Sequence, residues 1–170
     1  MICFFSFQLN PEQLGEVLIS VCYRPVSKTL TLFILKASNL IKLHKTRFIS
    51  KSINDTNRFE NALSFYLDPY IKIYIFYKGQ RIDKRRTTTK RTTQSPVFNE
   101  YFSFEINKDD LLDVRLDLIV FDFDSRVKHE PIGRFSIGKT EPDSGEFWLD
   151  VCQRQLNKPR TRWFSLNIFE

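Results

Sequence analysis

The chain has few of the residues on which several common function classes depend. Its three cysteines, Cys3, Cys22 and Cys152, are odd in number, far apart and without a Cys-x-x-Cys pair. A disulfide framework or a zinc site is therefore not expected, and a reducing compartment fits better. The two histidines, His44 and His129, are accompanied by no Gly-x-Ser-x-Gly, His-Glu-x-x-His or glycine-rich phosphate loop. The sequence thus predicts a non-catalytic module.

Long apolar runs are also missing. No window of about 18 or more apolar residues exists, so a transmembrane segment is not expected. Residues 1–7 are apolar, but they are few and lack a basic start and a small-residue cleavage site, which argues against a signal peptide. If the chain meets a membrane, we expect it to do so from the side, as a peripheral protein.

Apolar residues are nevertheless sufficient for one packed core. Of the 170 residues, 42% are hydrophobic and 17 are Phe, and a chain of this length commonly forms one domain. We expect an N-terminal extension over 1–14 and a single domain over 15–170. The segment 45–66 interrupts this domain as a long insertion, because it has no clear strand pattern.

Short runs of alternating residues, separated by turn signals about every 10 residues, dominate the rest of the chain. In the run 114–121, for example, every second residue is Val or Leu. A single helical turn near 107–110 and a longer helix over 143–156 interrupt the strands. So many strands with so little helix predict an all-β, two-sheet antiparallel sandwich. The expected strands are Glu16–Tyr23, Lys28–Ala37, Pro69–Lys78, Arg81–Arg91, Tyr101–Ile106, Val114–Phe121, Pro131–Gly138 and Arg162–Ile168.

The positive charge is localised. Between Lys78 and Arg91 there are seven basic residues and one acid, a balance of +6 that equals the net charge of the whole chain. Such a cluster indicates a phosphate-bearing or acidic partner, while the alternative is an edge strand that carries Lys and Arg to prevent aggregation. Nucleic acid is not expected, because Thr87, Thr88 and Thr89 stand where exposed aromatic residues would be needed for base stacking.

Acidic residues stand beside three of the predicted strands. Asp68 precedes the third strand, Asp122 and Asp124 end the sixth, and Glu130 follows six residues after Asp124. In an extended chain, residues two apart point the same way, so Asp122 and Asp124 aim into one pocket. Calcium prefers about 6–8 oxygen ligands, largely from carboxylates and loop carbonyls. These acids are therefore candidate calcium ligands.

Several motifs together resemble those of C2 domains. Residues 67–72 (Leu-Asp-Pro-Tyr-Ile-Lys) are similar to the Ser-Asp-Pro-Tyr-Val-Lys signature, and residues 95–100 (Ser-Pro-Val-Phe-Asn-Glu) to Asn-Pro-Val-Phe-Asn-Glu. Residues 84–91 resemble the polybasic fourth strand, while 120–124 and 131–133 resemble the third calcium loop and its exit. Trp148 and the ending 158–163 are typical of the second C2 domain of synaptotagmins and of the Doc2 and rabphilin group. The resemblance spans Gly15 to about Leu166 and implies an eight-stranded antiparallel C2 β-sandwich with a short helix before the last strand.

This resemblance assigns calcium as the candidate cofactor but implies a weakened site. The family uses five acids, of which the second to fourth are present as Asp68, Asp122 and Asp124, and the fifth aligns with the longer Glu130. The first falls on His44, and imidazole is a poor calcium ligand. The segment after His44 leaves open whether another acid, such as Asp55, takes this role. We therefore expect calcium dependence to be weak or lost.

The resemblance also implies partners. It predicts docking on anionic membranes (phosphatidylserine and phosphoinositides) and on SNARE proteins in vesicle trafficking and regulated exocytosis, with a clathrin adaptor as a further partner. The protein would then be cytoplasmic and peripheral at the vesicle or plasma membrane. The alternative is a calcium-independent protein-interaction scaffold that uses the basic strand. The expected binding residues are Arg81, Lys84, Arg85, Arg86, Lys90 and Arg91, and the expected membrane contacts at the loop tips are Lys45, Arg126 and Lys128.

Overall fold

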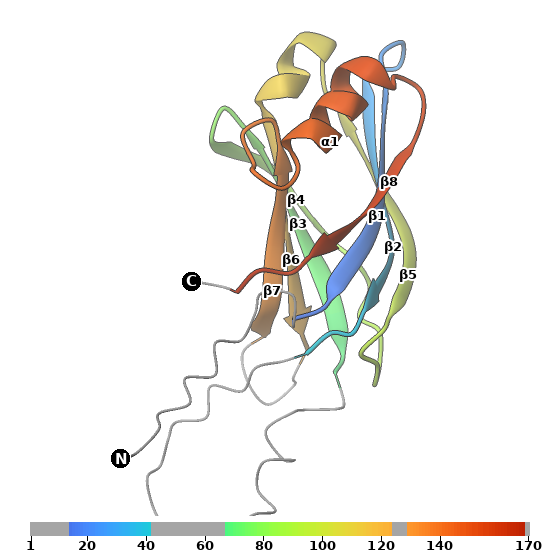
Figure 1. Cartoon of the computed structure of the whole chain (residues 1–170), viewed down its shortest axis with the longest axis vertical. Helices are drawn as coiled ribbons and strands as arrows, with labels where there is room; N and C mark the ends of the chain where they lie inside the picture. Colours follow the sequence, from blue (N-terminus) through green and yellow to red (C-terminus); the bar gives the residue numbers. More distant parts are fainter. Residues whose placement is uncertain (1–13, 42–66, 124–128, 169–170) are drawn as a thin grey trace, which may run out of the picture.

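The computed structural model describes residues 14–41, 67–123 and 129–168. It contains eight strands in two four-stranded antiparallel sheets, with the orders β5-β2-β1-β8 and β4-β3-β6-β7. The two sheets face each other (Figure 1), which confirms the predicted eight-stranded sandwich. The strands are β1 (Glu16–Arg24), β2 (Thr29–Ser38), β3 (Pro69–Tyr77), β4 (Gln80–Arg86), β5 (Val97–Glu105), β6 (Val114–Asp122), β7 (Glu130–Gly138) and β8 (Arg160–Ser165).

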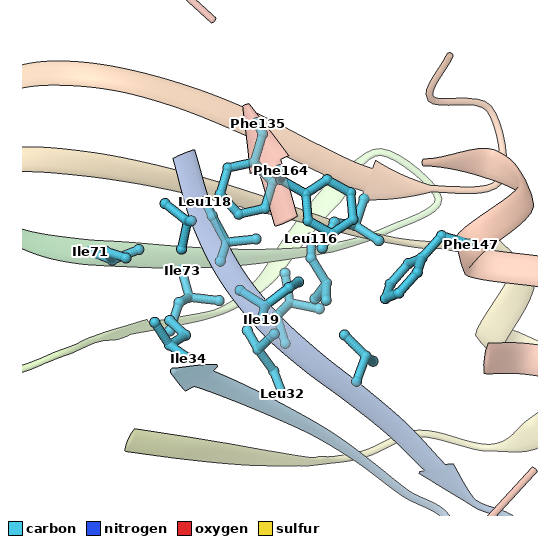
Figure 2. Packing of buried hydrophobic residues seen from close by; sticks show 14 of the residues in the cluster. Ile19, Leu32, Ile34, Ile71, Ile73, Leu116, Leu118, Phe135, Phe147 and Phe164 are labelled. Atoms are coloured by element: carbon cyan, nitrogen blue, oxygen red, sulfur yellow. The ribbon is translucent and has the colours of Figure 1, made fainter. Parts of the chain in front are cut away.

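The core lies between the sheets and follows from the two-residue period of the strands. In β6 every second residue from Val114 to Val120 is buried, while the residues between them face outward. Figure 2 shows Leu116 and Leu118 of this row packed with Ile73 and, from the other sheet, Ile19. Full burial of one such side chain contributes about 1.5–3 kcal/mol. The core therefore supplies most of the force that holds the two sheets together.

Helical segments close one end of the sandwich. They are η3 (Lys108–Asp113), a 3-10 helix, and α1 (Gly145–Leu149), which continues directly into the π-helical turn η4 (Asp150–Arg154). Phe147 and Trp148 of α1 are buried in the core. At the opposite end β3 begins and β6 ends (Figure 1). Within the described ranges, no helix has both the length and the apolar character needed to cross a bilayer.

The fourth strand ends five residues earlier than the sequence predicts, at Arg86 instead of Arg91. Thr87 is 2% exposed, and both its hydroxyl and its backbone bond to the backbone of Ile71. The following residues hydrogen-bond to Pro69 and Leu67 without forming a ladder. The Thr87 hydroxyl thus accepts the hydrogen bond from the Ile71 N–H that a backbone carbonyl would accept in a regular ladder. The pairing of β4 with β3 ends at this point.

Two other strand boundaries differ from the prediction by three residues or more. β5 begins at Val97 instead of Tyr101, because a register shift opposite β2 and the left-handed backbone of Asn99 (φ 53°) interrupt the alternation on which the prediction relied. β8 ends at Ser165 instead of Ile168, since Asn167 pairs with Arg134 of β7 across the open side of the sandwich.

Leu118→Ala should destabilise the domain by about 2–5 kcal/mol, because the fully buried side chain leaves a cavity in the packed core. Val26→Ala is the matched control: Val26 is 98% exposed, and its loss should change stability by less than about 0.5 kcal/mol. Urea denaturation followed by circular dichroism measures both. Equal effects of the two substitutions would contradict this packing.

The Cys152 thiol should be inert in the native protein. Burial raises its pKa to about 12, so almost no thiolate, the reactive form, is present at pH 8. We expect iodoacetamide to label Cys152 slowly in native buffer and rapidly in urea, as followed by peptide mass spectrometry. Rapid labelling in native buffer would show that η4 does not bury this side chain.

Candidate functional site

The outer surface of the β3–β4 hairpin carries a group of cations. The register pairs Lys72 with Arg86 and Tyr74 with Lys84, and the outward row of β3 therefore meets that of β4. Arg81 joins them, because its guanidinium carbon lies 5.8 Å from the centre of the Tyr74 ring. Lys72, Arg81, Lys84 and Arg86 are named the basic face below.

Aromatic rings lie beneath these cations. The Lys84 Nζ is 5.6 Å from the centre of the Tyr74 ring, and the Lys72 Nζ is 4.0 Å from that of Phe121 in β6. Rings in this position attract cations through their electron-rich faces. They also provide apolar surface beside the positive charge, which suits a ligand with an anionic head.

Lys72 was not among the residues predicted from the sequence. It could have been found, because it occupies an outward position in the alternating run 69–78. Burial lowers the pKa of its amine, and repulsion from Lys84 and Arg86 adds to the effect. Among the described residues, no carboxylate forms an ion pair with Lys72, Arg81, Lys84 or Arg86. An anion placed here would relieve this repulsion.

The other predicted basic residues are held by acids. Arg85 lies on the opposite side of β4, because it pairs with the inward Ile73, and its guanidinium is 3.0 Å from Asp83. Lys90 pairs with a carboxylate of β5, and Arg91 with the acid before β3, as described below. The structure therefore divides the six predicted residues into two groups, and only Arg81, Lys84 and Arg86 belong to the basic face.

Three of the predicted calcium ligands lie at the end of the sandwich opposite α1. Asp122 pairs with Pro69 on one side and with Glu130 on the other, so Asp68, Asp122 and Glu130 stand at neighbouring strand ends. Asp122 is 6% exposed, because it continues the inward row of β6. Its Oδ1 accepts a 2.9 Å hydrogen bond from the Asp68 backbone N–H. A buried carboxylate requires such a donor.

Asp68 is bound by the segment that follows β4. Its Oδ1 accepts a 2.8 Å hydrogen bond from the Thr92 N–H, and its Oδ2 is 3.1 Å from the Arg91 Nη1. Both oxygens therefore contact groups of the protein itself. The ion pair is exposed on the arginine side, and such pairs contribute about 0–1 kcal/mol.

The described acids do not by themselves fit calcium, which requires about 6–8 oxygen ligands. Within the ranges that the structure describes, no three His, Cys, Asp or Glu side chains are placed to hold a metal ion together. The other residues predicted to bind calcium or to contact a membrane lie outside the described residues; they are His44, Lys45, Asp55, Asp124, Arg126 and Lys128.

A cleft of about 1030 Å³ opens between the edge strands β7 and β8. Arg134 and Arg162 line it, and Phe135 and Phe164 stack at its apolar wall with ring centres 5.0 Å apart. Acidic side chains balance the arginines in this lining. None of the residues predicted from the sequence to bind a partner lines this cleft.

Comparison with known proteins gives a consistent result. Residues 28–166 match the family model described as the C2 domain. Synaptotagmin-11 of Mus musculus is 33% identical over 157 residues, which are 91% of this chain and 32% of that protein. Synaptotagmin-2 of Homo sapiens is 34% identical over 158 residues, or 92% of this chain and 33% of that protein. The chain spans about a third of the length of these curated relatives.

Solved structures share the fold. A C2 domain of RIM from Drosophila superimposes with a TM-score of 0.62 at 18% identity, covering 90% of this chain and 98% of that one. The first C2 domain of human synaptotagmin XIII gives 0.57 at 14% identity, with coverage of 98% and 94%. At such low identity the likeness supports the architecture alone.

Thr87→Val should destabilise the domain by about 1–3 kcal/mol, because the isosteric side chain leaves the buried N–H of Ile71 without its acceptor. Thr161→Val, at an exposed position in β8, is the matched control and should have little effect. Chemical denaturation compares the two variants. If both are neutral, the hydroxyl of Thr87 does not determine where β4 ends.

Proposed function

Because the chain belongs to the C2 domain family, we propose that it is a non-catalytic module that docks on anionic membrane surfaces through its basic face. The observation that carries the proposal is the arrangement of Lys72, Arg81, Lys84 and Arg86 over aromatic rings, with no carboxylate of the described residues paired to them. Phosphatidylserine and phosphoinositides present the matching charge, and arginine binds phosphate groups with two parallel hydrogen bonds.

The binding free energy available from this contact indicates that stable attachment to a membrane needs a second contact. Each Lys or Arg near an anionic leaflet contributes about 1 kcal/mol, so four cations give at most about 4 kcal/mol. That corresponds to a dissociation constant of about 1 mM, weakened further by salt. The loop tips with Lys45, Arg126 and Lys128 are the proposed second contact, because two linked contacts bind far more tightly than either alone.

Calcium is proposed to contribute little to this docking. His44 stands where the resemblance places the first acid, and imidazole is a poor calcium ligand. In addition, both oxygens of Asp68 already contact Thr92 and Arg91. A calcium ion at this end would have to compete with these contacts. The positive loop tips would partly replace the charge that a bound ion supplies.

The cellular role is a further proposal that rests on the likeness to synaptotagmins. It comprises a cytoplasmic, peripheral location, vesicle trafficking and exocytosis, and binding to SNARE proteins and a clathrin adaptor. An acidic helical partner would use the same basic face as an anionic membrane. The protein-scaffold alternative therefore predicts variants of this face that lose the acidic helix but keep vesicle binding.

The double variant Lys84→Ala/Arg86→Ala should weaken binding to phosphatidylserine vesicles by about 30-fold, because it removes two cations of the basic face. The control Arg85→Ala/Lys90→Ala removes the same net charge, but its residues are paired with Asp83 and Glu100. We expect it to weaken binding by less than about fivefold. Vesicle co-sedimentation at two salt concentrations measures both.

Equal losses in the two double variants would show that net charge alone governs binding, which contradicts a defined basic face. The same assay with calcium and with a chelator tests the calcium proposal. We expect similar binding in both. Strong binding with calcium and none with chelator would overturn the proposal that calcium contributes little.

A further inference from the structure

Five threonines lie between the end of β4 and Ser95, and the structure distinguishes the hydroxyl groups of three of them. That of Thr87 is buried against Ile71, and that of Thr93 accepts a hydrogen bond from the Ser95 N–H. Thr88 differs, because its residue is exposed and its hydroxyl donates to Glu100 of β5, a strand of the other sheet. Thr92 is exposed as well, but of these two only Thr88 has arginines two and three positions before it.

Glu100 of β5 holds Thr88 in place. Its Oε1 accepts a 2.6 Å hydrogen bond from the Thr88 hydroxyl, and both carboxylate oxygens lie 3.1 Å from the Thr88 backbone N. The Lys90 Nζ is 3.7 Å from the same carboxylate. All these contacts are made at the protein surface, where they are weak enough to be exchanged for contacts with another molecule.

The residues before Thr88 form a recognisable charge pattern. Arg85 and Arg86 stand three and two positions before it, at the end of β4. β4 is the outer strand of its sheet, and Thr88 follows two residues after its end. Protein kinases select substrates by charge patterns, and an acidic substrate groove accepts paired cations before the acceptor hydroxyl.

We propose that Thr88 is a phosphorylation site for a protein kinase that selects basic sequences. The Thr88 Oγ1 attacks the γ-phosphorus of Mg-ATP, and the bond from that phosphorus to the β,γ-bridging oxygen breaks. ADP leaves, and the hydroxyl proton passes to the catalytic aspartate of the kinase. No oxidant or reductant is involved.

Phosphate at this position would act on both the fold and the basic segment. It carries a charge of about −1.5 to −2 at pH 7, so it repels the Glu100 carboxylate that now holds Thr88. It also lowers the balance of residues 78–91 from +6 to about +4. If the basic face binds membranes, as proposed above, phosphorylation weakens that binding by about 10- to 30-fold.

The first experiment tests the site itself. The full chain is incubated with Mg-ATP and the catalytic subunit of cyclic-AMP-dependent protein kinase, and phosphate is located by peptide mass spectrometry. We expect one phosphate on Thr88, absent in Thr88→Ala and restored in Thr88→Ser. Arg85→Gln should lower kcat/KM by about tenfold or more, whereas Arg81→Gln, the same charge change further away, should leave it within about twofold.

Glu100→Gln should raise the phosphorylation rate, because a neutral amide accepts a weaker hydrogen bond from the Thr88 hydroxyl than the carboxylate does. Phosphate that appears on Thr92 or Thr93 instead would overturn the proposal. So would a folded chain that takes up no phosphate while a synthetic peptide of residues 82–93 does, since the fold would then hide the hydroxyl.

The second experiment tests the consequence and keeps the two proposals separate. Phosphorylated and untreated protein are compared in co-sedimentation with phosphatidylserine vesicles, with kinase-treated Thr88→Ala as the control. We expect weaker binding only for the phosphorylated wild-type chain. Phosphate on Thr88 with unchanged vesicle binding would support the modification site and contradict the membrane role of the basic face.

Discussion

The register of β3 with its two neighbours is the constraint on which the rest of the structure depends. β3 pairs with β4 on one side and with β6 on the other. Its two-residue period sends Ile71 and Ile73 into the core and Lys72 and Tyr74 to the outer surface. A slip by one residue would exchange the two rows, exposing apolar side chains and burying a lysine. Hydrophobic burial therefore holds the basic face in place, although none of its cations contributes to the core.

The segment from Thr87 to Pro96 connects the two parts of the candidate site. It leaves the basic face where Thr87 turns inward, and it then passes the acidic end, where Thr92 and Arg91 contact Asp68. The basic residues between Lys78 and Arg91 thus do not form a single surface. Some of them face solvent, and others neutralise carboxylates of the protein. A total charge of +6 overstates what a membrane would encounter.

Much of the fold is predictable from the sequence, because alternation is a local property of the chain. The run 114–121 indicates a strand with one buried side, and it is one. The placement of Asp68, Asp122 and Glu130 at strand ends also follows from such runs, since each acid stands directly beside one, whereas the pairing that makes these ends neighbours does not. Where a boundary depends on a distant partner, the sequence pattern is insufficient. The end of β4 is an example, because it requires Ile71 beside Thr87.

The sequence by itself determined that the chain is an all-β sandwich with one concentrated basic segment and with acids at its strand ends. Composition and the two-residue period suffice for this, because both are read along a single stretch of chain. Only the tertiary structure decided which cations act together. Arg85 and Arg86 are adjacent in sequence, yet one lies beside Asp83 and the other across from Lys72. The side that each takes depends on the pairing of β4 with β3 and on a register shift within that pairing, which no single segment encodes.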